Sequence, residues 1–170
     1  EWFIGRPVFE LKQRDDTSMI IDIIPFYDPH PDYGRERMLW NGKLNVPQMI
    51  NSICSYTPRN ELIIQKLQEV LQRDPERQVL ILSDRRNHLK TLEKMIMEAD
   101  LGSTGYYVGG MKEQQLKESE SKRILLATNS MAAEGMDIPG LNTLLIASPI
   151  SSIEQPIGRI QRQKAHERKY

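Results

Sequence analysis

After residue 58, apolar positions along the chain follow two alternating patterns. Stretches in which apolar residues recur every three or four positions predict amphipathic helices, and short continuous apolar runs predict strands covered on both faces. The helical stretches span residues 60–71, 89–99, 113–119, 130–134 and 153–163. The strand-like runs span residues 79–82, 106–108, 124–127 and 143–147. Asn60 is the expected N-cap of the first of these helices.

This alternation predicts an α/β fold with a mostly parallel sheet and helices on both sides. Right-handed crossovers place every strand-to-helix loop at one edge of such a sheet, and ligands of parallel folds bind there. The loops that begin at Ser83, Gly109, Thr128 and Ser148 are therefore expected to line a single functional edge.

The first 58 residues show a less regular pattern. It predicts strands at residues 3–11 and 19–24, a turn-rich loop at 26–34 and a short helix at 46–53. We therefore divide the chain into an N-terminal segment, 1–58, and a domain, 59–170. The segment either completes the sheet or links the domain to another one that precedes it.

Composition narrows the class of function. The chain has 170 residues with 23 basic and 23 acidic side chains, so its net charge is zero. This excludes a histone-like protein that binds by bulk charge. No apolar run approaches the ~20 residues of a membrane span. Cys54 is the single cysteine, which excludes an intrachain disulfide and a cysteine-based zinc cluster and favours intracellular chemistry. Because the chain begins at Glu1 without a signal peptide, we expect a part of a longer protein.

Two of the expected loops carry groups that suit contact with phosphate. Ser83 and Arg85 follow the first strand of the domain, although helix capping by Ser83 or Asp84 explains the same residues. Gly109 and Gly110 follow the second strand, where paired glycines let the backbone approach a polyanion closely. A plain turn is the alternative for this pair.

The loop after the third strand is more informative. Thr128 and Ser130 can donate hydrogen bonds to a phosphate, and Asp137 can accept one from a ribose hydroxyl. A capped turn in which Asp137 bonds its own backbone is the alternative. The chain holds neither a G-x-x-x-x-G-K-[ST] phosphate loop nor a G-x-G-x-x-G dinucleotide motif.

The last predicted helix carries a local excess of positive charge. Residues 151–170 hold five basic and two acidic side chains, which fit either a solvated helix or an anion site. Gln155, Arg159 and Arg162 are spaced four and three apart and so share one helical face. Such a face suits a nucleotide polyphosphate, and a surface salt-bridge face is the alternative.

At these residues the sequence resembles the superfamily 2 helicases. Residues 127–139 (ATNSMAAEGMDIP) resemble their motif V, and residues 79–86 (VLILSDRR) resemble motif IV. Residues 155–162 (QPIGRIQR) match motif VI, Q-x-x-G-R-x-x-R, at every defined position. The resemblance covers about residues 60–163 and implies the second domain of such a helicase, a RecA-like three-layer sandwich.

A finer resemblance lies nearer the N-terminus. The RNELI stretch at residues 59–63 and the strand around Gly5 resemble the helicases of large cytoplasmic DNA viruses, of the poxvirus and asfarvirus kind.

The family resemblance implies a role for each nucleotide-facing residue. Arg162 would be the arginine finger that stabilises charge on a γ-phosphate held by the first RecA-like domain. Arg159 would support it, and Gln155 would couple nucleotide binding to domain closure. Gly135 and Asp137 would contact the ribose.

The resemblance also implies a surface for nucleic acid. The residues expected to hold its backbone are Ser83, Arg85, Gly109, Gly110, Thr128 and Ser130. Backbone contacts carry no sequence information. ATP and Mg²⁺ would be held mainly by the first domain, whose phosphate loop and D-E-x-[HD] motif are missing here. No metal site is expected in this chain, and the chain alone is expected not to hydrolyse ATP.

We therefore expect the C-terminal half of an ATP-dependent helicase or translocase, a monomer without a membrane partner. Its partners would be DNA or RNA and the N-terminal RecA-like domain of the same protein. The expected location is the cytoplasm, with the viral factory or virion allowed by the resemblance. The alternative is a non-catalytic RecA-like module that binds nucleic acid or a protein. A flavodoxin-like or phosphate-binding α/β protein would leave Gln155, Arg159 and Arg162 unexplained.

Overall fold

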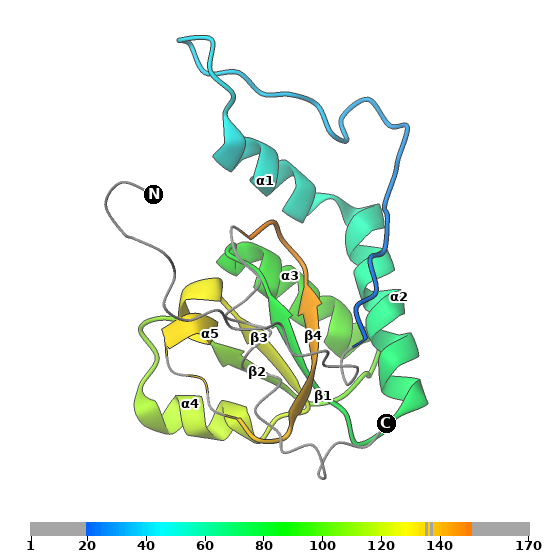
Figure 1. Ribbon diagram of the computed structural model, residues 1–170, viewed down its shortest axis with the longest axis vertical. Helices are drawn as coiled ribbons and strands as arrows, with labels where there is room; N and C mark the ends of the chain where they lie inside the picture. Colours follow the sequence, from blue (N-terminus) through cyan, green and yellow to red (C-terminus); the bar gives the residue numbers. More distant parts are fainter. Residues whose placement is uncertain (1–19, 135, 137, 151–170) are drawn as a thin grey trace, which may run out of the picture.

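The computed structural model describes residues 20–134, 136 and 138–150, and in this part of the chain four strands form one sheet (Figure 1). They are β1 (Gln78–Leu82), β2 (Thr104–Tyr107), β3 (Ile124–Ala127) and β4 (Leu141–Ile146). Their order is β2-β3-β1-β4, and every neighbouring pair is parallel. The expected α/β fold is confirmed, and each strand begins and ends within two residues of its expected bounds.

The described residues also form five helices. They are α1 (Val46–Ser55), α2 (Thr57–Arg73), α3 (Arg86–Glu98), α4 (Glu113–Glu120) and α5 (Asn129–Glu134). Each agrees with a helix expected from the sequence, apart from its ends. The expected N-cap at Asn60 is wrong, because α2 begins three residues earlier, with Pro58 in its first turn. The boundary expected after residue 58 therefore falls inside the first turn of α2.

Apolar cores lie on both faces of the sheet. Successive strand residues point to opposite faces, so Val79 and Ile81 lie in one core and Leu80 and Leu82 in the other. Helices α2 and α3 cover the first face with their buried residues Ile64, Leu67, Leu71, Leu89, Leu92 and Ile96. On the second face, α4 and α5 contribute Leu116 and Ala132. The fold is thus a three-layer sandwich of helix, sheet and helix.

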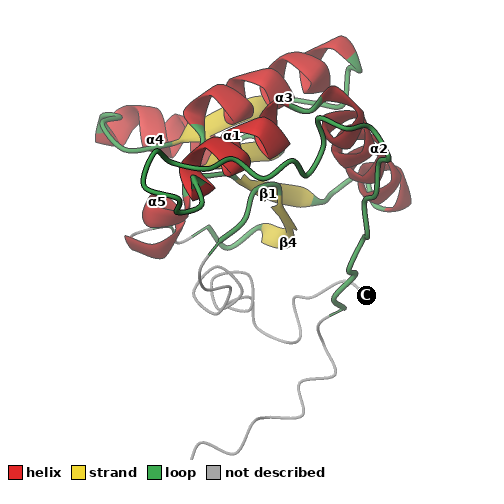
Figure 2. Cartoon of the chain, turned by 90° about the horizontal axis from the view of Figure 1, so that it is seen from above, coloured by secondary structure: helices red, strands yellow, loops and turns green. Residues whose placement is uncertain are grey.

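Helix α1 belongs to neither helical layer. It lies beyond the carboxyl ends of the strands, across the edge of the sheet (Figures 1 and 2). Its first turn begins at a side-chain cap, in which Asn45 Oδ1 accepts a hydrogen bond from the backbone N–H of Gln48 at 3.2 Å. The position of α1 brings it next to the edge that carries the candidate residues.

The segment before α1 differs from its expected structure. Residues 20–24 form no strand, and Ile20 and Ile23 are each 89% exposed. A β-branched run forms a strand only where a neighbouring strand pairs with it and its side chains find packing partners. Among the described residues none before Gln78 joins the sheet, and the strand expected at 3–11 lies outside the described residues.

The turn-rich loop expected at 26–34 is confirmed, and it packs on the junction of α1 and α2. The Phe26 and Tyr33 rings meet edge to face with centroids 5.1 Å apart, and the Tyr33 and Tyr56 centroids are 4.8 Å apart. The Tyr56 hydroxyl donates to Asp28 at 2.8 Å. Burial and this bond to the carboxylate raise the pKa of Tyr56 to about 12.

Candidate functional site

The carboxyl ends of the strands bring the four expected loops to one edge of the sheet. The backbone N–H of Ser83 donates to Ala127 at 3.0 Å, and that of Ala147 donates to Leu82 at 2.9 Å. The loops after β1, β3 and β4 are therefore neighbours. The parallel pairing of β2 with β3 adds the loop after β2, which contains Gly109 and Gly110 and is called the glycine loop below. The expectation of a single edge for these loops is confirmed.

Asp84 ties three of these loops together. Its backbone N–H donates to the Ser148 hydroxyl at 3.1 Å, after β4. Its carboxylate accepts from the backbone N–H of Asn129 at 3.2 Å and from the Asn129 side-chain amide at 3.0 Å, after β3. One residue thus fixes the loop after β1 against both neighbouring loops. Capping of α3 by Asp84 or Ser83 is not observed, since the N-cap of α3 is Arg85 without a side-chain cap.

Arg86 ties in the fourth loop, the one that follows β2. Its guanidinium donates to the carbonyl oxygen of Gly109. Gly110 has a φ of +87°, which favours glycine, and open space surrounds the position of a Cβ there. The backbone at Gly110 is therefore open to approach by a ligand.

Ser83 faces inward, into a chain of buried polar groups behind the edge. Its side chain is fully buried and its hydroxyl lies 2.9 Å from Nδ1 of His88. Nε2 of His88 lies 3.0 Å from Oδ1 of Asn60, whose amide donates to the Cys54 carbonyl at 2.9 Å. The Ser83 oxygen also accepts from the backbone N–H of Arg85 at 3.3 Å.

This chain of bonds shows which nitrogen of His88 carries a proton. Asn60 Oδ1 only accepts, so Nε2 of His88 carries a proton, and in the neutral ring Nδ1 accepts from the Ser83 hydroxyl. Burial, with the nearby Arg59 charge as a smaller cause, lowers the pKa of His88 to about 4. His88 is therefore neutral near pH 7 and holds Ser83 in place. Desolvation likewise raises the pKa of the buried Cys54 thiol.

The other candidates for nucleic-acid binding lie at the open side of the edge. Arg85 is half-buried and its Nε donates to Asn51 of α1 at 2.6 Å. Ser130 is exposed, and its hydroxyl lies 3.4 Å from that of Thr128. The two hydroxyls lie on the loop next to the glycine loop, the Arg85 guanidinium lies against α1, and Ser83 is buried behind them. Binding of nucleic acid by these residues stays a prediction.

Five candidate residues lie outside the described part of the chain. They are Gly135, Asp137, Gln155, Arg159 and Arg162. Their roles toward nucleotide stay predictions. The structure adds residues that the sequence did not single out for the edge, Asn129, His88 and Asn51. Their partners lie as many as 45 residues away, so local sequence patterns give no sign of them.

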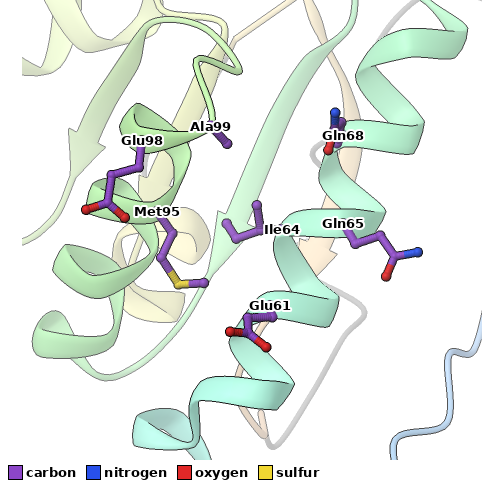
Figure 3. Close-up of a pocket in the computed structure, with 7 residues that line it drawn as sticks. All are labelled: Glu61, Ile64, Gln65, Gln68, Met95, Glu98 and Ala99. Carbon is purple, nitrogen blue, oxygen red and sulfur yellow. The ribbon is translucent and has the colours of Figure 1, made fainter.

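A shallow depression lies between α2 and α3, away from the edge (Figure 3). Its lining residues are Glu61, Ile64, Gln65, Gln68, Met95, Glu98 and Ala99. It carries two carboxylates and no basic group, so its charge does not suit a polyanion. Within the described residues, no three His, Cys, Asp or Glu side chains gather as a metal site would require. None of the helices described is both long and apolar enough to cross a bilayer.

Comparison with known proteins identifies relatives of the chain. The family described as "Helicase conserved C-terminal domain" matches residues 62–164. The chain is 34% identical to "Putative ATP-dependent RNA helicase L396" of Acanthamoeba polyphaga mimivirus, over 98% of the chain and 32% of that protein. It is 28% identical to "Transcript termination protein A18" of vaccinia virus (strain Ankara), over 89% of the chain and 33% of that protein. The chain thus spans about a third of the length of these relatives.

Solved structures share the fold. The structure of T4 UvsW matches 72% of the chain and 26% of its own length, with a TM-score of 0.55 and 20% identity. Domain 2 of the DEAD-box helicase Mss116p, solved with an RNA duplex, matches 69% of the chain and 48% of its own length. Its TM-score is 0.51 and its identity 16%. The sheet and its helices therefore form the RecA-like fold of helicase C-terminal domains.

Proposed function

Because the chain belongs to the superfamily 2 helicases as their C-terminal domain, with viral proteins among its relatives, we propose that it forms the nucleic-acid-binding half of an ATP-dependent helicase or translocase. In this role the edge of the sheet holds the sugar–phosphate backbone of a DNA or RNA strand. The first helicase domain, in the remainder of a longer protein, binds ATP and Mg²⁺. The C-terminal segment of the chain approaches that nucleotide across the interface between the two domains.

The observation that carries this proposal is the set of hydrogen bonds by which Asp84 and Arg86 connect the four loops. Asp84 lies in the loop after β1 and Arg86 is the first residue of α3, and between them they reach the loops after β2, β3 and β4. Fixed backbone and hydroxyl donors bind a phosphate chain with little loss of entropy, since they are already in position. A polyanion that crosses this edge meets Thr128, Ser130 and Gly110 on neighbouring loops. Contacts of this kind are independent of base sequence.

The coupling to ATP rests on motif VI. Arg162, supported by Arg159 and Gln155, stabilises the charge that develops on the γ-phosphate. Gly135 and Asp137 contact the ribose of the same nucleotide. The chain holds no phosphate loop of its own, so turnover requires the first domain and the isolated chain does not hydrolyse ATP.

Binding of labelled single-stranded oligonucleotides across a salt series tests the proposed surface. We expect weak binding by the 170-residue chain, equal for unrelated sequences, with a shallow log–log salt slope because few phosphates are contacted. Thr128→Val should weaken it several-fold. Thr91→Val is the matched control, because this exposed hydroxyl lies on α3 and bonds only its own helix. Tight binding that depends on base sequence, or equal effects of the two variants, would contradict the proposal.

A non-catalytic RecA-like module remains the second candidate. One measurement separates this candidate from the helicase. If the module is non-catalytic, a protein that contains both helicase domains shows no ATPase activity stimulated by nucleic acid.

A further inference from the structure

A tight turn with a tryptophan at its tip stands out on the surface before α1. Residues 37–45, the tryptophan turn, are closed by an antiparallel bridge between Met38 and Leu44. The backbone N–H of Leu39 donates to Lys43 at 2.7 Å. Between these residues the Trp40 side chain is 98% exposed. The faces of the indole ring are therefore open to a partner.

The turn is held firmly in place. The backbone N–H of Gly42 donates to Leu39 at 3.0 Å, and Gly42 adopts a φ of +77° that favours glycine. The Asn41 side chain accepts from the backbone N–H of Lys43 at 3.1 Å. The backbone N–H of Asn45 donates to Arg37 at 2.7 Å, and the Asn45 side chain caps α1. The turn and the helix therefore form one unit.

That unit connects the turn to the candidate edge. Asn51, in the middle of α1, accepts a hydrogen bond from Arg85 of the loop after β1 at 2.6 Å. Six residues of helix separate Asn51 from the cap at Asn45, about 9 Å along the axis. The turn projects from the N-terminal end of α1, on the side of the molecule where the strands end (Figure 1, light blue). A nucleic-acid strand that crosses the edge and continues along α1 would reach the tryptophan turn.

The charges around the tryptophan decide what kind of partner it fits. Residues 35–43 carry three basic side chains, Arg35, Arg37 and Lys43, against one acidic side chain, Glu36. In the described part of the chain no ion pair engages the three basic groups. The net charge of +2 lies in a chain whose total is zero. Arg35 and Lys43 are exposed and Arg37 is half-buried. An exposed aromatic ring flanked by cations is the arrangement that binds an unpaired base and its phosphates.

We infer that Trp40 is a stacking platform for a base of an unpaired nucleic-acid strand, with Arg35, Arg37 and Lys43 along the adjoining phosphates. The inference rests on the proposed function, because the same strand occupies the edge of the sheet. It adds a contact outside the helicase motifs, on the segment that precedes the matched domain. A base held in a duplex has its faces covered by its neighbours, so the platform selects unpaired strands.

The tryptophan itself reports on the contact. In a Trp2→Phe background Trp40 is the single tryptophan of the chain, and stacking of a base quenches its fluorescence. We expect dT20 and rU20 to quench the emission as they bind and a blunt duplex to leave it unchanged. Trp40→Leu should weaken the binding of both oligonucleotides about tenfold, whereas Trp40→Phe should retain most of it. Tyr27→Leu is the matched control, an exposed aromatic outside the turn. Lys43→Gln should reduce the log–log salt slope by about one.

The outcomes separate the inference from the proposed function. Oligonucleotide binding with unchanged Trp40 emission, or equal binding by Trp40→Leu, overturns the stacking platform and leaves the edge intact. Absence of any binding by the wild-type chain overturns both. Equal quenching by duplex and single strand also contradicts the inference, as does binding by Trp40→Leu that is weakened no more than by Tyr27→Leu.

Discussion

Asp84 and Asn129, 45 residues apart, hold each other through two hydrogen bonds at the candidate edge. The carboxylate accepts from the backbone N–H of Asn129 at 3.2 Å and from its side-chain amide at 3.0 Å. Because the same aspartate also donates its backbone N–H to Ser148, the pair sets the spacing of the loops after β1, β3 and β4. Any strand bound across these loops meets a surface whose geometry depends on this contact.

Asp84→Asn should therefore disturb the edge more than the core. The new amide places a donor opposite the donors of Asn129, so one of the two hydrogen bonds is lost, and we expect unfolding to become easier by about 1 kcal/mol. Urea denaturation measures this change. Glu98→Gln is the control, because it removes an exposed carboxylate whose ion pair with Lys94 is long, at 3.7 Å, and contributes little. Equal stability changes in the two variants would contradict a stabilising role for the hydrogen bonds between Asp84 and Asn129.

The neutral His88 makes stability depend on pH in a defined direction. Its pKa in the folded chain is about 4, below the ordinary 6.5 of the unfolded chain. The unfolded state therefore binds a proton more readily, and stability is lost as pH falls from about 6.5 to 4. The loss should be on the order of 3 kcal/mol across this window.

Urea unfolding at several pH values isolates this contribution from that of the carboxylates. The pH-dependence of His88→Gln, subtracted from that of the wild type, should give the loss in the stated window. His30→Gln is the control, since His30 is exposed. A His88→Gln variant whose stability falls as steeply as that of the wild type between pH 6.5 and pH 4 would contradict the buried neutral histidine.

Substitution by alanine should lower stability at one glycine of the domain and only oligonucleotide binding at another. A Cβ at Gly105 in β2 would lie 2.9 Å from the Cα and Cβ of Ser119 in α4, so helix and strand must move apart. We expect Gly105→Ala to destabilise the fold by about 1–3 kcal/mol. A Cβ at Gly109 meets its nearest atom, on Arg86, at an ordinary 3.7 Å. Gly109→Ala should keep the melting temperature and weaken only oligonucleotide binding.

Thermal unfolding and anisotropy on the same two proteins check this pair. A normal melting temperature for Gly105→Ala would show that α4 packs less closely on β2. Normal oligonucleotide binding by Gly109→Ala would remove the glycine loop from the proposed surface.

Arg162→Ala should abolish most ATP turnover in a protein that contains both helicase domains. An arginine finger acts mainly in the transition state, so turnover should fall about 10³-fold while ATP affinity changes little. Arg162→Lys should not restore the rate, because an ammonium lacks the planar fork of a guanidinium. Arg168→Ala, in the same basic C-terminal stretch but outside motif VI, is the control. Wild-type turnover in Arg162→Ala would exclude the finger role, and a large drop in melting temperature would indicate a structural one.

The sequence predicted the sheet well because β1 and β3 are almost wholly apolar, whereas polar residues at the starts of β2 and β4 shifted their expected bounds by two residues. The strand at 124–127 agrees at both ends, and the shared edge follows from the topology alone. The β-branched run at 19–24 misled, since strand formation depends on a neighbouring strand rather than on composition. Asn60 misled because its amide serves a buried contact with Cys54 and His88 instead of the start of a helix. Contacts between distant residues, such as Asp84 with Asn129, leave no periodic signal.

The strand order β2-β3-β1-β4 has a consequence for folding during synthesis on the ribosome. Among the described strands β1 is made first and lies in the middle of the sheet, and both of its neighbours come later in the chain, β3 from residue 124 and β4 from residue 141. Until β3 and β4 have been made, both hydrogen-bonding edges of β1 stay unpaired, and Leu80 and Leu82 lack the partners that α5 and the later strands bring to their face. Such nascent segments are the ones that aggregate or engage chaperones. The described sheet is complete only after β4 has emerged, which makes its assembly a late event.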